Sequence, residues 1–231
     1  MPKTIDPAIG RAFSRKLRAW YRRNARDLPW RRTRDAYQIL VSELMLQQTQ
    51  VSRVVTRYGE FLEEFPTLGD VARARPARVM EAWEGLGYYA RARNLHRLAR
   101  TVTNDAREPD QPLPSEPDQL RALPGIGAYT AGAVASFAYE RRAALVDTNV
   151  ARVIKRVFAP GVDVKSTRGN QRVWAIANAL LPRTGRATWT HNQALMELGA
   201  LVCTARVAHC SRCPVRSICR SAAKPRQGRP T

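Results

Sequence analysis

The chain has 231 residues and a mass of 26.0 kDa, and its 39 Lys and Arg residues against 19 Asp and Glu residues give a formal net charge of +20. This length suffices for the core of one or two domains, and the charge favours a polyanionic partner such as nucleic acid. A run of about 18 apolar residues, which a membrane-spanning helix requires, does not occur. The first residues also lack the apolar core of a signal peptide, so we expect a cytoplasmic protein.

Apolar residues recur at three- and four-residue spacing in several segments, which predicts an all-α fold. The longest stripe spans residues 51–65, and Pro66 ends its helix. Shorter stripes predict helices around residues 13–20 and 79–86. Sustained alternation with hairpin turn chemistry is absent, so we expect no sheet. The stripes comprise Phe13, Leu17 and Trp20; Val51, Val54, Val55, Tyr58, Phe61, Leu62 and Phe65; and Val79, Trp83 and Leu86.

Residues 104–114 are polar and contain three prolines, which predicts a loop. The segment 115–139 follows, with the sequence SEPDQLRALPGIGAYTAGAVASFAY. Ser115 is a candidate cap for a helix that runs to Leu123, and a second helix is expected to begin near Ala128. Gly125 and Gly127 lie in the turn between them and permit a close approach of the backbone. The turn is either an ordinary helix corner or a phosphate-binding turn, and the positive charge favours the second interpretation.

The only four cysteines of the chain are Cys203, Cys210, Cys213 and Cys219, in the pattern C-x6-C-x2-C-x5-C. Disulfides require an oxidising compartment, which the N-terminal sequence does not indicate. Four thiolates so close in sequence suit zinc or an iron–sulfur cluster, and His209 could replace one cysteine at zinc. Residues 221–231 beyond them are basic and are expected to be disordered.

The full cysteine spacing resembles the [4Fe-4S] loop of the endonuclease III and MutY group of DNA glycosylases. The LPGIG turn, Asp147 twenty residues after Gly127, and the cysteines follow the order seen in the helix-hairpin-helix/GPD superfamily. The resemblance covers residues 10–220 and implies two helical domains with DNA in the cleft between them. One domain is a six-helix barrel at 29–141, with the helix-hairpin-helix at 115–139. The other combines 1–28 with 142–220, and its loop 203–219 is expected to hold a structural [4Fe-4S] cluster.

Three further stretches resemble the MutY-type adenine glycosylases, namely RDLPWR at 26–31, SELMLQQTQ at 42–50 and GLGYYARARNLH at 85–96. By this resemblance Glu43 protonates the departing adenine, and Asp147 is the carboxylate that faces the sugar. The resemblance also implies that the protein binds double-stranded DNA containing a mispair, acts in base excision repair and works as a monomer. The expected DNA contacts are Arg26, Trp30, Arg31, Leu46, Gln48, Thr49, Tyr88, Arg91, Gly125 and Gly127.

Cleavage of an N-glycosidic bond requires both kinds of carboxyl group, because positive charge develops on the sugar and negative charge on the leaving base. We expect Glu43 to lie in a pocket that raises its pKa and Asp147 to stay ionised. Relatives that also cut the strand carry a Lys where this chain has Tyr129. Without that amine no Schiff base forms, so we expect a monofunctional glycosylase in which Tyr129 orients Asp147 or lines the pocket.

Two alternatives to adenine removal stay open at this stage. MutY-type proteins usually carry an additional C-terminal domain that helps to recognise 8-oxoguanine, and the end of the chain shortly after Cys219 predicts a short form without it. Short members of the superfamily include glycosylases that remove thymine or uracil opposite guanine. A non-catalytic helix-hairpin-helix module that only binds DNA is the alternative from a different class.

Overall fold

The computed structural model describes residues 5–104 and 113–222. Most of the predicted loop at 104–114 and of the predicted tail at 221–231 therefore lies outside the described residues. Within the described ranges all regular elements are helices, and the only β pairing is an isolated bridge between Cys203 and Ala208. The predicted all-α fold is confirmed. None of the described helices combines the length and the apolar character needed to cross a membrane.

The chain forms two compact units, and one of them is built from both ends of the sequence. It consists of Met1–Ala25 together with Ala144–Thr231, whereas the other is Arg26–Ala143. The predicted boundaries after residues 28 and 141 differ from these by three residues and by two.

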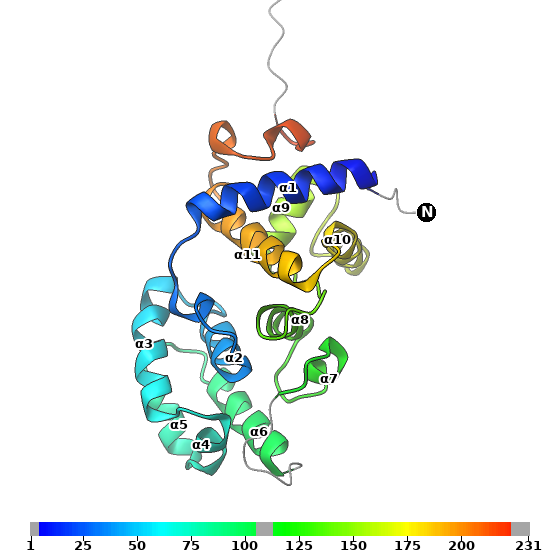
Figure 1. Cartoon of the computed structure of the whole chain (residues 1–231). Helices are drawn as coiled ribbons and strands as arrows, with labels where there is room; N and C mark the ends of the chain where they lie inside the picture. The colour runs from blue at the N-terminus through cyan, green and yellow to red at the C-terminus, as the bar shows by residue number, and fades with distance from the viewer. Residues whose placement is uncertain (1–4, 105–112, 223–231) are drawn as a thin grey trace, which may run out of the picture. The chain divides into compact units, whose positions relative to one another are not determined.

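In the unit made from both ends, α1 and α9 each pack against α10 and α11 (Figure 1). Phe13 of α1 stands edge-on to Phe158 of α9, with 5.0 Å between the ring centroids. The short turns that hold the cysteines follow α11. The elements are α1 (Pro7–Asn24), α9 (Thr148–Phe158), α10 (Thr167–Leu180), α11 (Gly185–Leu201), η2 (Cys210–Arg212) and η3 (Arg216–Ile218).

In the unit Arg26–Ala143, α6 packs against α4 and α5, and α8 packs against α2 and α7. Trp83 and Phe61 are fully buried in its core, with edge-on rings 5.5 Å apart. The elements are η1 (Pro29–Arg31), α2 (Ala36–Met45), α3 (Val51–Glu64), α4 (Leu68–Arg73), α5 (Pro76–Ala82), α6 (Ala90–Asn104), α7 (Pro117–Arg121) and α8 (Ala128–Phe137).

Short-range signals set several helix ends. Asp35 caps α2 by accepting the Gln38 backbone N–H at 2.8 Å, and Thr67 and Asp70 form a reciprocal capping box at α4. The structure corrects the predicted start and end of α7. Glu116 is its N-cap rather than Ser115, because a residue directly before a proline at the first helical position is held extended. The helix ends at Arg121, before Leu123, where a series of tight turns leads to the glycines.

The predicted apolar stripes are mostly buried, with local exceptions. Val54, Tyr58 and Phe61 form the buried face of α3, whereas Val55 is 38% exposed on its flank. Of the stripe at 79–86, only Val79 lies within α5. Trp83 and Leu86 are buried from the turn that follows that helix.

A buried histidine makes the stability of the unit from both chain ends depend on pH. His191 of α11 contacts the Ser14 hydroxyl at 3.1 Å, and burial lowers its pKa to about 3. Between pH 6.5 and 3 the unfolded chain therefore binds a proton that the folded chain excludes, so stability falls as the pH falls. Between pH 7 and 5 the wild type should lose about 2 kcal/mol more unfolding free energy than His191→Gln. Denaturant titrations at both pH values measure this, and equal losses would contradict it.

Candidate active site and cysteine cluster

Glu43 lies near the C-terminal end of α2 and is only 3% exposed. Its Oε2 accepts a hydrogen bond of 2.7 Å from the hydroxyl of Tyr129, which stands in the first turn of α8. Both helices belong to the unit Arg26–Ala143, and they pack against each other. Tyr129 was expected to orient Asp147 or to line the pocket, and the structure shows that it bonds to Glu43, a partner not predicted for it.

The turn before α8 requires glycine at one of its two positions. Gly125 has a φ of +78°, and a Cβ built there would lie 2.6 Å from the Cβ of Asn94. A side chain at this position would therefore meet both backbone strain and a steric clash. Gly127 is the N-cap of α8 and has open space around it. Both glycines and Ala128, the first residue of α8, are exposed, and phosphate contact is predicted at this turn.

Asp147 is the N-cap of α9 and is half-buried. Its Oδ1 accepts the Val150 backbone N–H at 2.7 Å, and its Oδ2 accepts the side-chain amide of Asn149 at 2.9 Å. The local structure is thus a helix cap, and it also holds the carboxylate in one orientation.

Two arginines of α9 join the helix of Asp147 to the segment that carries the first cysteine. Arg152 donates to the Asn149 Oδ1 at 2.6 Å and to the Cys203 carbonyl at 2.8 Å. Arg156 donates to the Thr204 carbonyl at 2.7 Å and contacts the Cys203 Sγ at 3.3 Å. Burial lowers the pKa of Arg152 from its usual value. Neither residue could be singled out from the sequence, because a pair of arginines four apart on a helix has no signature of its own.

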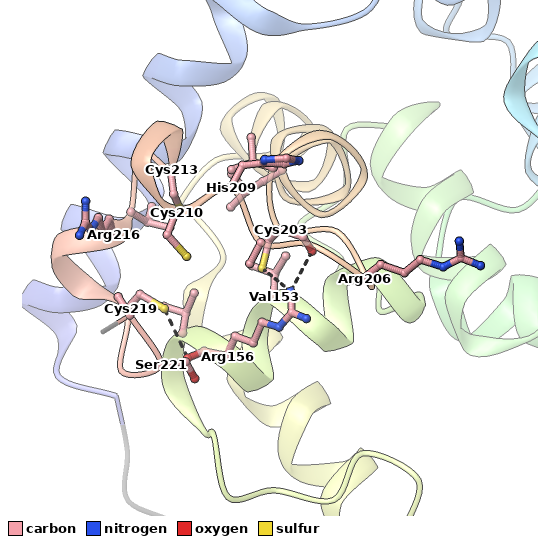
Figure 2. A pocket seen from close by; sticks show the side chains of 16 residues that line it. Val153, Arg156, Cys203, Arg206, His209, Cys210, Cys213, Arg216, Cys219 and Ser221 are labelled. Carbon is pink, nitrogen blue, oxygen red and sulfur yellow. Dashed lines mark hydrogen bonds between the residues drawn. The ribbon is translucent and has the colours of Figure 1, made fainter. Parts of the chain in front are cut away.

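The four cysteines line one cavity of about 360 Å³, together with Arg156, Arg206, His209 and Arg216 (Figure 2). None of the four forms a disulfide, and burial raises the pKa of Cys213. Among the described residues, no group of three or more His, Cys, Asp or Glu side chains is placed to hold a single metal ion.

A second cavity, of about 510 Å³, lies between the turn after α2 and the turn before α6. Gln48, Thr49 and Tyr88 line it, and Tyr88 is 60% exposed. Gln48 and Tyr88 both have positive φ values, +57° and +47°, which are rare for residues with a side chain. Leu46 is half-buried beside this turn. The structure thus brings together Gln48, Thr49 and Tyr88, three of the predicted DNA contacts, around one cavity.

Two of the predicted DNA contacts, Arg91 and Trp30, are buried. Arg91 is only 6% exposed, and its guanidinium bonds to carbonyl groups of the protein, so it is not available to a phosphate. Trp30 is 7% exposed and stands edge-on to Tyr58, with 5.5 Å between the ring centroids. Arg26 and Arg31 are half-buried and linked by a bond from the Arg31 side chain to the Arg26 carbonyl. Their contact with DNA stays a prediction.

Comparison with known proteins identifies the family to which the chain is similar. Residues 41–175 match the model of the HhH-GPD superfamily base excision DNA repair proteins. The chain is 44% identical over 225 residues to the human adenine DNA glycosylase, and 48% identical over 206 residues to that of Mycolicibacterium smegmatis. These alignments cover 94% and 89% of the chain, but 40% of the human protein and 68% of the bacterial one. The chain thus spans less than half the length of its human relative.

Solved structures show the same fold. A thermostable thymine-DNA glycosylase superimposes with a TM-score of 0.83 at 29% identity, over 93% of this chain and 97% of that one. Endonuclease III in a trapped covalent complex with DNA gives a TM-score of 0.77 at 22% identity, over 95% and 98% of the two chains. With the buried Glu43, the hairpin at Gly125 and the capping Asp147 in the matched region, the chain belongs to the HhH-GPD superfamily of base excision DNA repair proteins, and within it to the adenine DNA glycosylases.

Proposed function

We propose that the protein is a monofunctional DNA glycosylase that hydrolyses the N-glycosidic bond of an adenine mispaired with guanine or 8-oxoguanine. The observation that carries this proposal is the buried Glu43 with its hydrogen bond from Tyr129. A carboxyl group out of water and held by a hydroxyl suits a general acid that acts on a base taken out of the stack. The relatives named as adenine DNA glycosylases support the identity of that base.

The proposed reaction divides the work between two carboxyl groups. Glu43 gives its proton to the leaving adenine as the bond to C1′ breaks. The ionised Asp147 stabilises the positive charge that develops on the sugar. Water then adds to C1′, and the proton it loses restores Glu43. Tyr129 occupies the position of the lyase lysine and has no amine, so the proposed sequence ends with an abasic sugar and an intact strand.

The test of this proposal is single-turnover base release from four duplexes. They contain A opposite 8-oxoguanine, A opposite G, T opposite G, or U opposite G. We expect adenine release from the first two and no strand cleavage until alkali is added. Release of thymine or uracil alone would reject adenine as the substrate, and strand cleavage without alkali would reject the monofunctional mechanism.

A second candidate is thymine or uracil removal opposite guanine. The superposition with a thymine-DNA glycosylase over nearly the full length of both chains favours it. The identity to the adenine DNA glycosylases is higher than the identity to the thymine-DNA glycosylase. Together with the QQTQ and GLGYYARARNLH stretches, it favours adenine as the base removed. The four-duplex assay separates the two candidates directly.

We further propose that the partner is double-stranded DNA with a mispair, bound by a cytoplasmic monomer. The net charge of +20 supports a polyanionic partner, and Arg206, Arg212 and Arg216 are exposed around the cysteines, where a DNA backbone can reach them. Binding should weaken steeply with added salt because contacts to phosphates release counterions.

The four cysteines have the donor chemistry and the common cavity that fit a [4Fe-4S] cluster. Bound there, the cluster would act as a structural cross-link for the segment 203–219 and take no part in bond cleavage.

Loss of one cysteine is expected to remove the cluster and to destabilise the fold. Cys210→Ser should abolish the brown colour and the visible absorption of the purified protein and lower the Tm by roughly 10 °C, because binding energy at such a site is folding energy. Ser211→Ala, at an exposed neighbour, is the matched control and should retain both. Iron and sulfide analysis completes the measurement. Colourless wild-type protein with stoichiometric zinc would contradict the cluster.

A further inference from the structure

The guanidinium of Arg91, in the first turn of α6, joins two turns that are far apart in the sequence. One turn follows α2 at residues 46–50, and the other precedes α6 at residues 85–89. Both turns line the cavity of about 510 Å³. The acceptors of Arg91 are the carbonyls of Leu44 (2.7 Å), Met45 (2.8 Å), Gln47 (2.8 Å), Leu86 (3.0 Å), Gly87 (2.8 Å) and Tyr88 (3.4 Å) and the hydroxyl of Thr49 (3.2 Å).

The nitrogens of the guanidinium divide their hydrogen bonds between the two turns. Nη1 donates to the three carbonyls at and after the end of α2, where helix carbonyls lack helical partners and the helix dipole favours a cation. Nη2 and Nε donate to the second turn, and Nη2 also reaches Thr49. Seven acceptors exceed the five N–H groups of an arginine, so some of these bonds are shared. A lysine has three donors from a single nitrogen and cannot serve both turns in this way.

The residues that most need such support lie in these same turns. Gln48 and Tyr88 hold left-handed backbone conformations, at φ values of +57° and +47°. For a residue with a side chain this conformation costs free energy and persists only where the surroundings impose it. The Tyr88 ring also lies against the cation, with its centroid 5.5 Å from the Cζ of Arg91. The strained backbone sends both side chains toward solvent, where they are exposed.

We propose that Arg91 is a positioning residue that holds Gln48 and Tyr88 in these conformations before DNA binds, and thereby sets the discrimination between opposite bases. This inference rests on the proposed function, since it assumes that the two turns meet the mispair. Arg91 does not touch the DNA in this proposal. It fixes the relative placement of two exposed side chains that would otherwise relax independently, and discrimination depends on that placement.

The experiment compares Arg91→Lys and Arg91→Gln with the wild type. Arg100→Lys and Arg100→Gln serve as matched controls, because Arg100 lies on the same helix with an exposed side chain. The first readout is the ratio of the single-turnover rates for A opposite 8-oxoguanine and A opposite G. The second is hydrogen exchange of the amides at 46–50 and 85–89 without DNA. We expect both Arg91 variants to lower the rate ratio by about tenfold or more and to speed exchange in both turns. The controls should change neither.

A merely structural role would slow both duplexes by the same factor and leave the ratio unchanged, and that result in folded Arg91→Lys would overturn the proposal. Unchanged exchange at either turn would overturn it as well. Should Arg91→Gln fail to fold, Arg91→Lys alone decides, because it keeps the charge and the aliphatic stem. Failure of the proposed function gives a different result, because the wild type would then release adenine from neither duplex. The exchange data would still test whether Arg91 orders the two turns.

Discussion

Asp147→Asn is expected to slow adenine release by about a thousandfold without unfolding α9, because it removes the charge that would stabilise the sugar cation. Asparagine is as good an N-cap as aspartate, and its Oδ1 can still accept the Val150 N–H. The variant therefore separates the charge of Asp147 from its role as a cap. Single-turnover rates at saturating enzyme measure the effect, and circular dichroism checks the fold.

Asp35→Asn provides the matched control for this substitution. Asp35 caps α2 as Asp147 caps α9, by accepting the backbone N–H three residues later, at 2.8 Å in α2 and 2.7 Å in α9. We expect Asp35→Asn to leave the rate of adenine release unchanged. If Asp147→Asn kept full activity, or if both variants lost activity equally, the catalytic assignment of Asp147 would be wrong.

Glu43→Gln is expected to lower the rate by about a hundredfold to ten-thousandfold, the range of a lost general acid. Glutamine has the same shape and can still accept a hydrogen bond from the Tyr129 hydroxyl, so the packing around residue 43 should persist. The loss should be largest for adenine and smaller for a purine analogue that leaves without protonation. Comparison of the two leaving groups in single-turnover assays measures this, and an equal loss for both would argue against proton donation.

Tyr129→Phe tests whether the hydroxyl works through Glu43. Removing one hydrogen bond to this carboxyl group should cost about tenfold in rate. If the two residues act together, the double variant should be no slower than Glu43→Gln alone. Independent, multiplying losses would place Tyr129 in a separate role, such as contact with the flipped base.

The helical segments and the order of the motifs could be predicted from the sequence because they depend on short-range rules. Apolar spacing identified the buried face of α3, and the glycine turn marked the start of α8 within one residue. Glu43 and Asp147 could be singled out through family resemblance, since each taken alone is an ordinary helix carboxylate. The pairing of Glu43 with Tyr129 joins residues 86 positions apart, which no local pattern encodes.

Arginines show where sequence reasoning fails. Arg91 and Arg93 stand two residues apart in one basic segment, yet the first is buried and the second is exposed. Composition favours phosphate contact for both, because a strongly basic chain offers the same interpretation for each arginine. Only the fold reveals that carbonyls from two distant turns converge on Arg91. Arg152 and Arg156 could not be singled out for the same reason, because their acceptors at Gly199 and Cys203 lie 47 to 51 residues away in the sequence.

The division of the chain has a consequence for its synthesis on the ribosome. The unit Arg26–Ala143 is continuous, so all of it has emerged before the last cysteines are translated. In the other unit, α1 is translated first but packs against α10 and α11, which are translated late. These contacts have a long sequence separation, so this unit is expected to fold more slowly. In a nascent chain the surroundings of Glu43 can therefore fold first, whereas Asp147 becomes ordered only when the unit built from both chain ends folds. A chain that stops between Ala143 and Asp147 would carry Glu43 and the turn at Gly125 but would lack the second carboxyl group of the proposed reaction.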